Sequence, residues 1–143
     1  MVEVGESRMD REILVGMPES LAATAFKSGE QVAWEQADCA RAIDWFRSNS
    51  YALLGTELWL LKNGKIQAGI YTSGGYTIFG NSCDPEENEC WDDYICRSSN
   101  QAREAIAAFR WPEDSLEPSC PVYFNLCWAD REWFQSSGKF VSI

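Results

Sequence analysis

Residues 51–71 read Y-A-L-L-G-T-E-L-W-L-L-K-N-G-K-I-Q-A-G-I-Y and predict a β-hairpin. A mainly apolar run over 51–61 is followed by a short polar break and a second run over 65–71. Within the break, Asn63 and Gly64 readily take the positive φ angles of a two-residue type I′ turn, whose twist matches that of the flanking strands. The stretch therefore predicts two neighbouring antiparallel strands.

This hairpin is apolar on both faces of the predicted sheet. Successive side chains of a strand alternate between faces, and Trp59 and Leu61 share one of them. The other face takes the aliphatic residues Leu58, Leu60, Ile66, Ala68 and Ile70. A strand with two apolar faces is either covered on both sides or has one face that meets a partner.

Two helices are predicted outside the hairpin, over 36–48 and 98–110. Each has apolar residues at the helical spacing i, i+3, i+4, i+7. These stripes are Cys39, Ala42, Ile43 and Phe46 in the first helix, and Ala102, Ala105, Ile106 and Phe109 in the second. Ser98 and Gln101 have the spacing of a capping box, and Pro112 is expected to stop the second helix.

These elements predict one α+β domain over 1–143, with its core in 31–135 and a poorly defined segment over 1–30. The sheet is expected to be mainly antiparallel, to contain 51–61, 65–71 and 122–128, and to carry both helices. The pattern A-I-x-x-F-R occurs in both helices, at 42–47 and 105–110. It suggests two similar β-α-β units, although chance use of good core residues explains it equally well.

Shorter segments are assigned from composition. Strands are expected at 31–34, 76–79 and 91–97, with a loop over 80–89. Residues 11–17 suggest a strand and residues 21–27 one or two helical turns. Residues 129–135 form either a short helix or a frayed strand, and the tail after Gly138 is either loose or an edge strand.

Charge limits the partners that the protein can bind. Its 143 residues include 22 acidic and 12 basic side chains, which gives a net charge of −10. Nucleic acid and anionic membranes require basic residues that neutralise phosphates, so neither is expected as a partner. The charge fits a basic protein partner, a phosphate-mimicking inhibitor, or solubility alone. Seven Trp, seven Phe and five Tyr indicate either a ring-rich core or a recognition surface.

Absent residue types limit the chemistry. The sequence has no histidine, which removes Ser-His-Asp and Cys-His catalysis and histidine metal sites. The charged N-terminus has no apolar signal core, and no window has 18 uninterrupted apolar residues, which predicts a cytoplasmic protein. We therefore expect the six cysteines to be reduced. The spacing of Cys83, Cys90 and Cys96 differs from the C-x2–4-C of zinc sites, so neither metal nor cofactor is expected.

A run of acidic residues is the candidate site. Residues 83–93 read C-D-P-E-E-N-E-C-W-D-D, and residues 84–117 hold ten acidic and three basic side chains, or −7 of the net charge. The run lacks the order of a calcium loop. It is either a solvated loop or a docking surface for a basic protein. The predicted partner-binding residues are Asp84, Glu86, Glu87, Glu89, Asp92 and Asp93, with Trp91 and Tyr94 as aromatic anchors.

Three stretches together resemble a known family. They are A-R-A-I-D-W-F-R-x3-Y-A-L-L-G-T-E-L-W-L, W-D-D-Y-I-C-R-S followed by an alanine-rich helix, and Y-F-N-L-C-W-A-D-R-E. Over residues 33–133 this succession is similar to small immunity proteins of bacterial polymorphic toxin and contact-dependent inhibition systems. The resemblance implies an α+β domain that binds and neutralises a cognate toxin, and it brings no catalytic residues.

Three functions follow from these observations. The first is a non-enzymatic immunity protein that occludes a toxin. The second is an acidic, phage-type inhibitor that mimics nucleic acid against a host defence nuclease. The third is a small enzyme of unfamiliar type that uses cysteine or carboxylate side chains, for which Cys96 beside Arg97 is the nearest candidate nucleophile.

Overall fold

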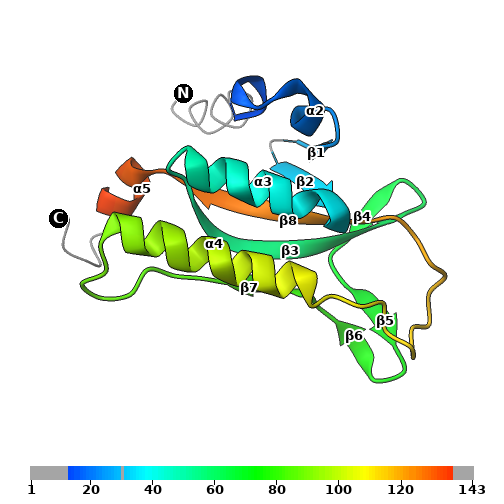
Figure 1. The fold of residues 1–143 in the computed structure, drawn as a ribbon. Helices are drawn as coiled ribbons and strands as arrows, with labels where there is room; N and C mark the ends of the chain where they lie inside the picture. Colours follow the sequence, from blue (N-terminus) through cyan, green and yellow to red (C-terminus); the bar gives the residue numbers. More distant parts are fainter. Residues whose placement is uncertain (1–12, 30, 137–143) are drawn as a thin grey trace.

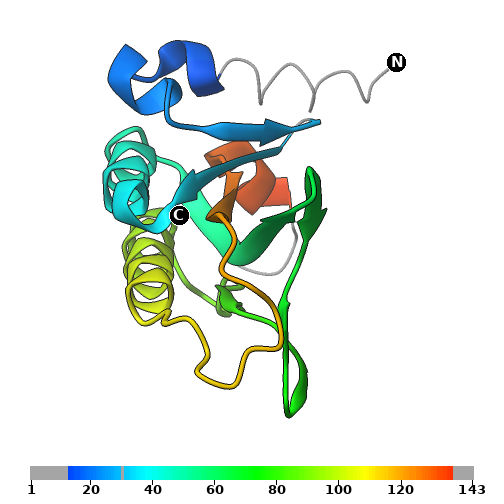
Figure 2. The same cartoon turned by 90° about the vertical axis from the view of Figure 1, so that its right-hand side faces the viewer.

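The computed structural model describes residues 13–29 and 31–136, and it confirms the predicted α+β fold. In this part of the chain a six-stranded sheet has the order β1-β2-β8-β3-β4, with β7 also paired to β3, and β5 and β6 form a separate two-stranded sheet. All the strand pairs are antiparallel. The two long helices, α3 and α4, lie side by side on one face of the large sheet (Figures 1 and 2).

The strands are β1 Phe26–Ser28, β2 Gln31–Glu35, β3 Ala52–Lys62, β4 Lys65–Gln67, β5 Ile70–Thr72, β6 Gly75–Thr77, β7 Gly80–Ser82 and β8 Val122–Ala129. The helices with complete bounds are α2 Glu19–Ala22, α3 Gln36–Ser48, α4 Trp91–Ala107 and α5 Arg131–Ser136. Residues 13–16 form a further helical turn.

The predicted hairpin turn is confirmed. Asn63 and Gly64 have φ angles of 53° and 77°, and Lys62 pairs with Lys65 across the turn. The predicted faces are partly wrong, because a two-residue turn places Ile66 opposite Leu61 rather than on the face of Leu60. The returning strand also ends earlier than predicted, since β4 stops at Gln67 and β5 pairs with β6 instead of β3.

Strand connections build two interlocking β-α-β units. Strands β2 and β3, joined by α3, both run antiparallel to β8, which lies between them. Strands β7 and β8, joined by α4, both run antiparallel to β3, which lies between them. Each unit is therefore split by a strand of the other. This arrangement makes β3 and β8 the central strands, and it sets α3 against α4.

The main core lies between these helices and the sheet. The stripe predicted for α3 is buried, and it meets Trp34 of β2, Leu58 of β3 and Phe124 of β8. Trp34 Nε1 donates to the Leu21 carbonyl at 3.1 Å, which ties α2 to the sheet. At the irregularity between Leu53 and Gly55, the Leu53 N–H donates instead to Ser98 Oγ of α4 at 3.1 Å.

The strand predicted over 91–97 is wrong, because α4 begins at Trp91 and runs through Ser98 without a break. Trp91, Tyr94, Ile95 and Ser98 are buried at helical spacing, so this segment continues the stripe of the second helix. The capping box predicted at Ser98 is wrong for the same reason. The helix ends at Ala107, three residues before the predicted end.

Other short segments also differ from the prediction. Residues 13–16 are helical rather than extended, and Phe26–Ser28 is a strand rather than a helical turn. Strand β7 forms within the predicted loop over 80–89. Of the two alternatives for 129–135 the helix is correct, as α5. The predictions for 1–12 and for the tail after Gly138 lie outside the described residues.

Candidate functional site

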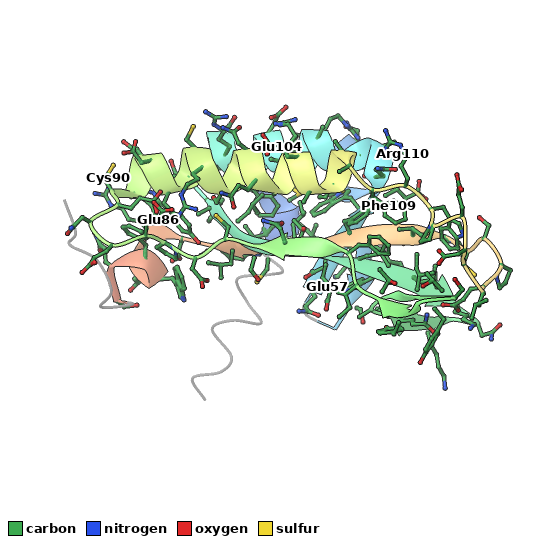
Figure 3. All side chains as sticks on the ribbon, turned by 90° about the horizontal axis from the view of Figure 1, so that it is seen from below. Glu57, Glu86, Cys90, Glu104, Phe109 and Arg110 are labelled. Carbon is green, nitrogen blue, oxygen red and sulfur yellow. The ribbon has the colours of Figure 1, made fainter. Side chains whose placement is uncertain are left out.

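Five of the predicted acidic residues are exposed at one end of the molecule. They lie in the loop between β7 and α4 and in the first turn of α4. We call this surface the acidic rim, and its members are Asp84, Glu86, Glu87, Asp92 and Asp93. Carboxylates in a first helical turn are stabilised by the positive end of the helix dipole, which helps to explain why α4 begins here. In Figure 3 this end of α4 is marked by Glu86 and Cys90.

The sixth acidic residue, Glu89, has a structural role. Its carboxylate accepts two hydrogen bonds from Arg97, at 2.8 Å from Nε and 2.7 Å from Nη2. The same guanidinium donates to the Asp84 carbonyl at 2.8 Å. These bonds to Arg97 hold the pKa of Glu89 below its ordinary value. Arg97 thus fixes the loop that carries the acidic rim.

The two predicted aromatic anchors lie in the core. Trp91 is 5% exposed and Tyr94 is fully buried, and both rings pack on Phe134 of α5 at centroid distances of 5.1 and 5.6 Å. The Tyr94 hydroxyl donates to the Cys83 carbonyl at 2.7 Å, and burial raises the pKa of Tyr94. Neither ring is exposed for a partner. They hold the acidic rim against α5 instead.

A second surface, which sequence reasoning missed, lies at the other end of α4. There the β5–β6 hairpin projects beyond the main sheet (Figures 1 and 2), and together with the edge strand β4 it forms a surface that we call the arm (residues 65–79). Tyr71 and Tyr76 face each other across the β5–β6 pair, with ring centroids 4.7 Å apart, and are 50% and 44% exposed. Exposed Ile66, Ile78 and Leu116 lie on the arm or against it. The one feature of the sequence that could have pointed to this surface is its charge, because residues 62–79 contain two lysines and no acidic residue.

The cysteines do not form an evident reactive centre. All six lie in the described ranges, and no two are joined by a disulfide. Burial raises the pKa of the Cys39 thiol to about 12 and also raises that of Cys83, which accepts a hydrogen bond from Arg97 at 3.3 Å. Arg97 therefore lies against Cys83 rather than Cys96, the candidate nucleophile, whose sulfur accepts a hydrogen bond from Arg47 at 3.4 Å on the exposed surface instead. Within residues 13–29 and 31–136 no group of three or more His, Cys, Asp or Glu side chains could hold a metal ion.

An acidic rim at one end of α4 and an exposed aromatic arm at the other are features of a protein that binds other proteins. The family comparison agrees, because residues 20–126 match the model of the family described as Immunity protein 40. The chain belongs to this family of immunity proteins, which confirms the resemblance predicted from the sequence. No curated protein and no solved structure matches the chain. None of the helices in the described part of the chain is long and apolar enough to cross a membrane.

Proposed function

We propose that this protein neutralises a cognate bacterial toxin by binding it, without catalysis of its own. Membership of an immunity protein family is the observation that carries the proposal. An immunity protein needs only to occlude the toxin, and a surface suffices for that. We assign this role to the two surfaces at the ends of α4, the acidic rim and the arm.

We propose further that the toxin is basic where it meets the acidic rim. The five rim carboxylates are exposed, and one of them, Glu86, also pairs with Arg97 at 3.8 Å, whereas the nearby Glu89 carboxylate is buried against Arg97. Rim charges of one sign attract a basic partner during encounter and raise the association rate more than the affinity. The net charge of −10 acts in the same direction. The rim is therefore expected to set how fast the toxin is captured.

Co-expression tests the function directly. Each open reading frame next to the gene is induced in a host cell, with this protein and with an unrelated acidic protein of similar size. We expect one neighbour to stop growth alone and to be tolerated only with this protein. The pair should then co-purify. If the neighbours are harmless, or if this protein fails to rescue a toxic one, the proposed function is wrong.

A further inference from the structure

The arm is held in place by one buried carboxylate. Glu117 accepts hydrogen bonds from Lys62 Nζ at 2.6 Å, from Gln67 Nε2 at 2.7 Å and from the Tyr71 backbone N–H at 2.8 Å. These three donors come from the end of β3, from β4 and from β5. One side chain thus joins β3 to the edge strand β4 and to the projecting strand β5. The arm is fixed before any partner arrives.

The segment over 112–118 lies along the arm and adds backbone bonds. The Leu116 N–H donates to the Tyr71 carbonyl at 2.8 Å, and the Ser73 N–H donates to the Asp114 carbonyl at 3.0 Å. Thr72 and Ser115 form an antiparallel bridge between them. Both ribbon views show the segment beside β5 and β6 (Figures 1 and 2). Because the backbone of the arm is already ordered, binding of a partner carries little entropic cost for ordering the arm.

The surface so presented has the exposed tyrosines of an interface centre, and it also carries Lys62 and Lys65. Tyr71 and Tyr76 expose a pair of rings, and an open concavity of about 580 Å³ lies beside them. The residues that line it are Lys62, Asn63, Lys65, Ile66, Gln67, Ala68 and Tyr76. Interface centres are enriched in Tyr and depleted of charge. In a chain of net charge −10, the 18 residues over 62–79 contain no acid.

We propose that the arm is a second contact site for the toxin, at which Tyr71 and Tyr76 provide most of the binding energy. This inference rests on the proposed function. A second copy of the chain is the less favoured occupant, because two proteins of net charge −10 repel each other. A basic toxin is attracted by the same charge. Its apolar side chains then bind against Tyr76 and Ile66 in the concavity.

The two surfaces are separated by the length of α4. The acidic rim lies at the start of α4, and Phe109, just after its end, packs edge-to-face on Phe79 at the base of the arm, with a centroid distance of 5.1 Å. Figure 3 labels Glu86 and Phe109 at these opposite ends. The 17 residues of α4 span about 25 Å. An interface that buries about 800 Å² per partner is about 30 Å across.

The test compares two variants of the full chain against the purified toxin that rescue identifies. In Tyr71→Ala/Tyr76→Ala the exposed rings are removed, and in the control Val15→Ser an exposed apolar side chain is removed from the helical turn at 13–16. We expect the double variant to dissociate at least tenfold faster, with an association rate within threefold of the parent. The control should match the parent. Melting curves and circular dichroism establish that each variant is folded.

Three results would overturn the inference. In the first, the folded double variant dissociates at the parental rate while the parent still binds and protects. The proposed function then stands and only the role of the arm is lost. In the second, sedimentation shows that the parent is a dimer and that the double variant is a monomer, which makes the arm a self-association surface. If the parent binds no neighbouring toxin at all, the proposed function fails first and the inference fails with it.

Discussion

The Lys62 ammonium group donates to the buried Glu117 carboxylate, with 2.6 Å between Nζ and Oε1, and so joins the end of β3 to a segment 55 residues away in the sequence. Glu117 receives two further hydrogen bonds, from Gln67 and Tyr71. No other carboxylate described here connects as many segments of the arm. The order of the arm is therefore expected to depend on the charge of one side chain.

Glu117→Gln is expected to destabilise the protein by about 1–3 kcal/mol. It leaves the Lys62 charge unpaired, and it can place an amide nitrogen against the Gln67 and Tyr71 donors, which need an acceptor. Chemical denaturation measures the change. Glu113→Gln is the matched control, since Glu113 is exposed in the same segment and its substitution should change the free energy of unfolding by less than about 0.5 kcal/mol. Equal effects of the two substitutions would contradict the anchoring role of Glu117.

Acid is expected to weaken the fold through Glu89 and Glu117. Hydrogen bonds, from Arg97 to Glu89 and from Lys62 to Glu117, lower both pKa values from an ordinary 4.5. The unfolded chain therefore binds protons at a higher pH than the folded one. The stabilisation from each group is complete above pH 4.5 and is lost as the pH falls through the lowered, folded-state pKa.

Urea denaturation between pH 7 and pH 3 tests this dependence. The parent should lose stability below the ordinary carboxyl pKa, and Glu89→Gln and Glu117→Gln should each reduce the slope in that range. Glu87→Gln serves as the control because Glu87 is exposed on the acidic rim. A parent whose free energy of unfolding does not change over the range would show that neither carboxylate is stabilised by its partner.

Arg97→Lys is expected to loosen the loop of the acidic rim. A lysine cannot reproduce the paired hydrogen bonds to Glu89 together with the bond to the Asp84 carbonyl. We expect a loss of about 1–2 kcal/mol and faster amide hydrogen exchange over 84–89. Arg103→Lys is the control, because Arg103 pairs with the exposed Asp44 on the helix surface and such pairs contribute little. If amide hydrogen exchange over 84–89 is unchanged in Arg97→Lys, then Arg97 does not fix this loop.

Trp91→Ala is expected to act on folding rather than on recognition. Trp91 is buried against Phe134, and truncation of such a side chain costs about 3 kcal/mol or more. Trp133→Ala is the matched control, because Trp133 is 38% exposed on α5, beside the buried Phe134, and its loss should cost less than about 1 kcal/mol. Thermal melting measures both variants. If the Trp91→Ala protein is as stable as the parent, the ring is not needed for folding, and the prediction that Trp91 binds the partner stands again.

The elements that could be predicted from the sequence are those whose formation depends on neighbouring residues. The hairpin turn depends on Asn63 and Gly64, and the stripe of α3 on a regular spacing, so both were predictable. Strand β7 was not, because its three residues G-N-S carry no apolar pattern. Its pairing with β3 brings Gly80 so close to the Thr56 carbonyl that a Cβ would lie 2.2 Å from that oxygen, so this position requires glycine.

The candidate site was likewise predictable only in part. A run of acids is visible in the sequence, and five of its members are exposed together. The burial of Trp91 and Tyr94 was missed because their residue types also favour strands, and only the spacing to Ser98 and Ala102 reveals one long helix. The arm depends on Glu117, whose partners lie 46 to 55 residues away, and no local pattern predicts such a contact.

The last prediction concerns the acidic rim and the rate of toxin capture. In Asp84→Lys/Glu86→Lys/Glu87→Lys, three exposed loop acids are reversed while Asp92 and Asp93 remain to stabilise the start of α4. We expect association with the toxin to slow at least tenfold at low salt and to depend less on ionic strength, because salt screens the attraction that the parent uses. Dissociation should change less. Stopped-flow mixing at several salt concentrations measures both rates.

A matched variant separates the position of the charges from their number. Glu19→Lys/Glu35→Lys/Glu104→Lys reverses three exposed acids outside the rim and changes the net charge by the same amount. If the electrostatic field of the rim itself steers the toxin, this variant should associate with the toxin faster than the rim variant at low salt. If the two variants slow association equally, the toxin responds only to the total charge of the protein. If the rim variant associates as fast as the parent, the rim is a solvated surface and has no part in capture.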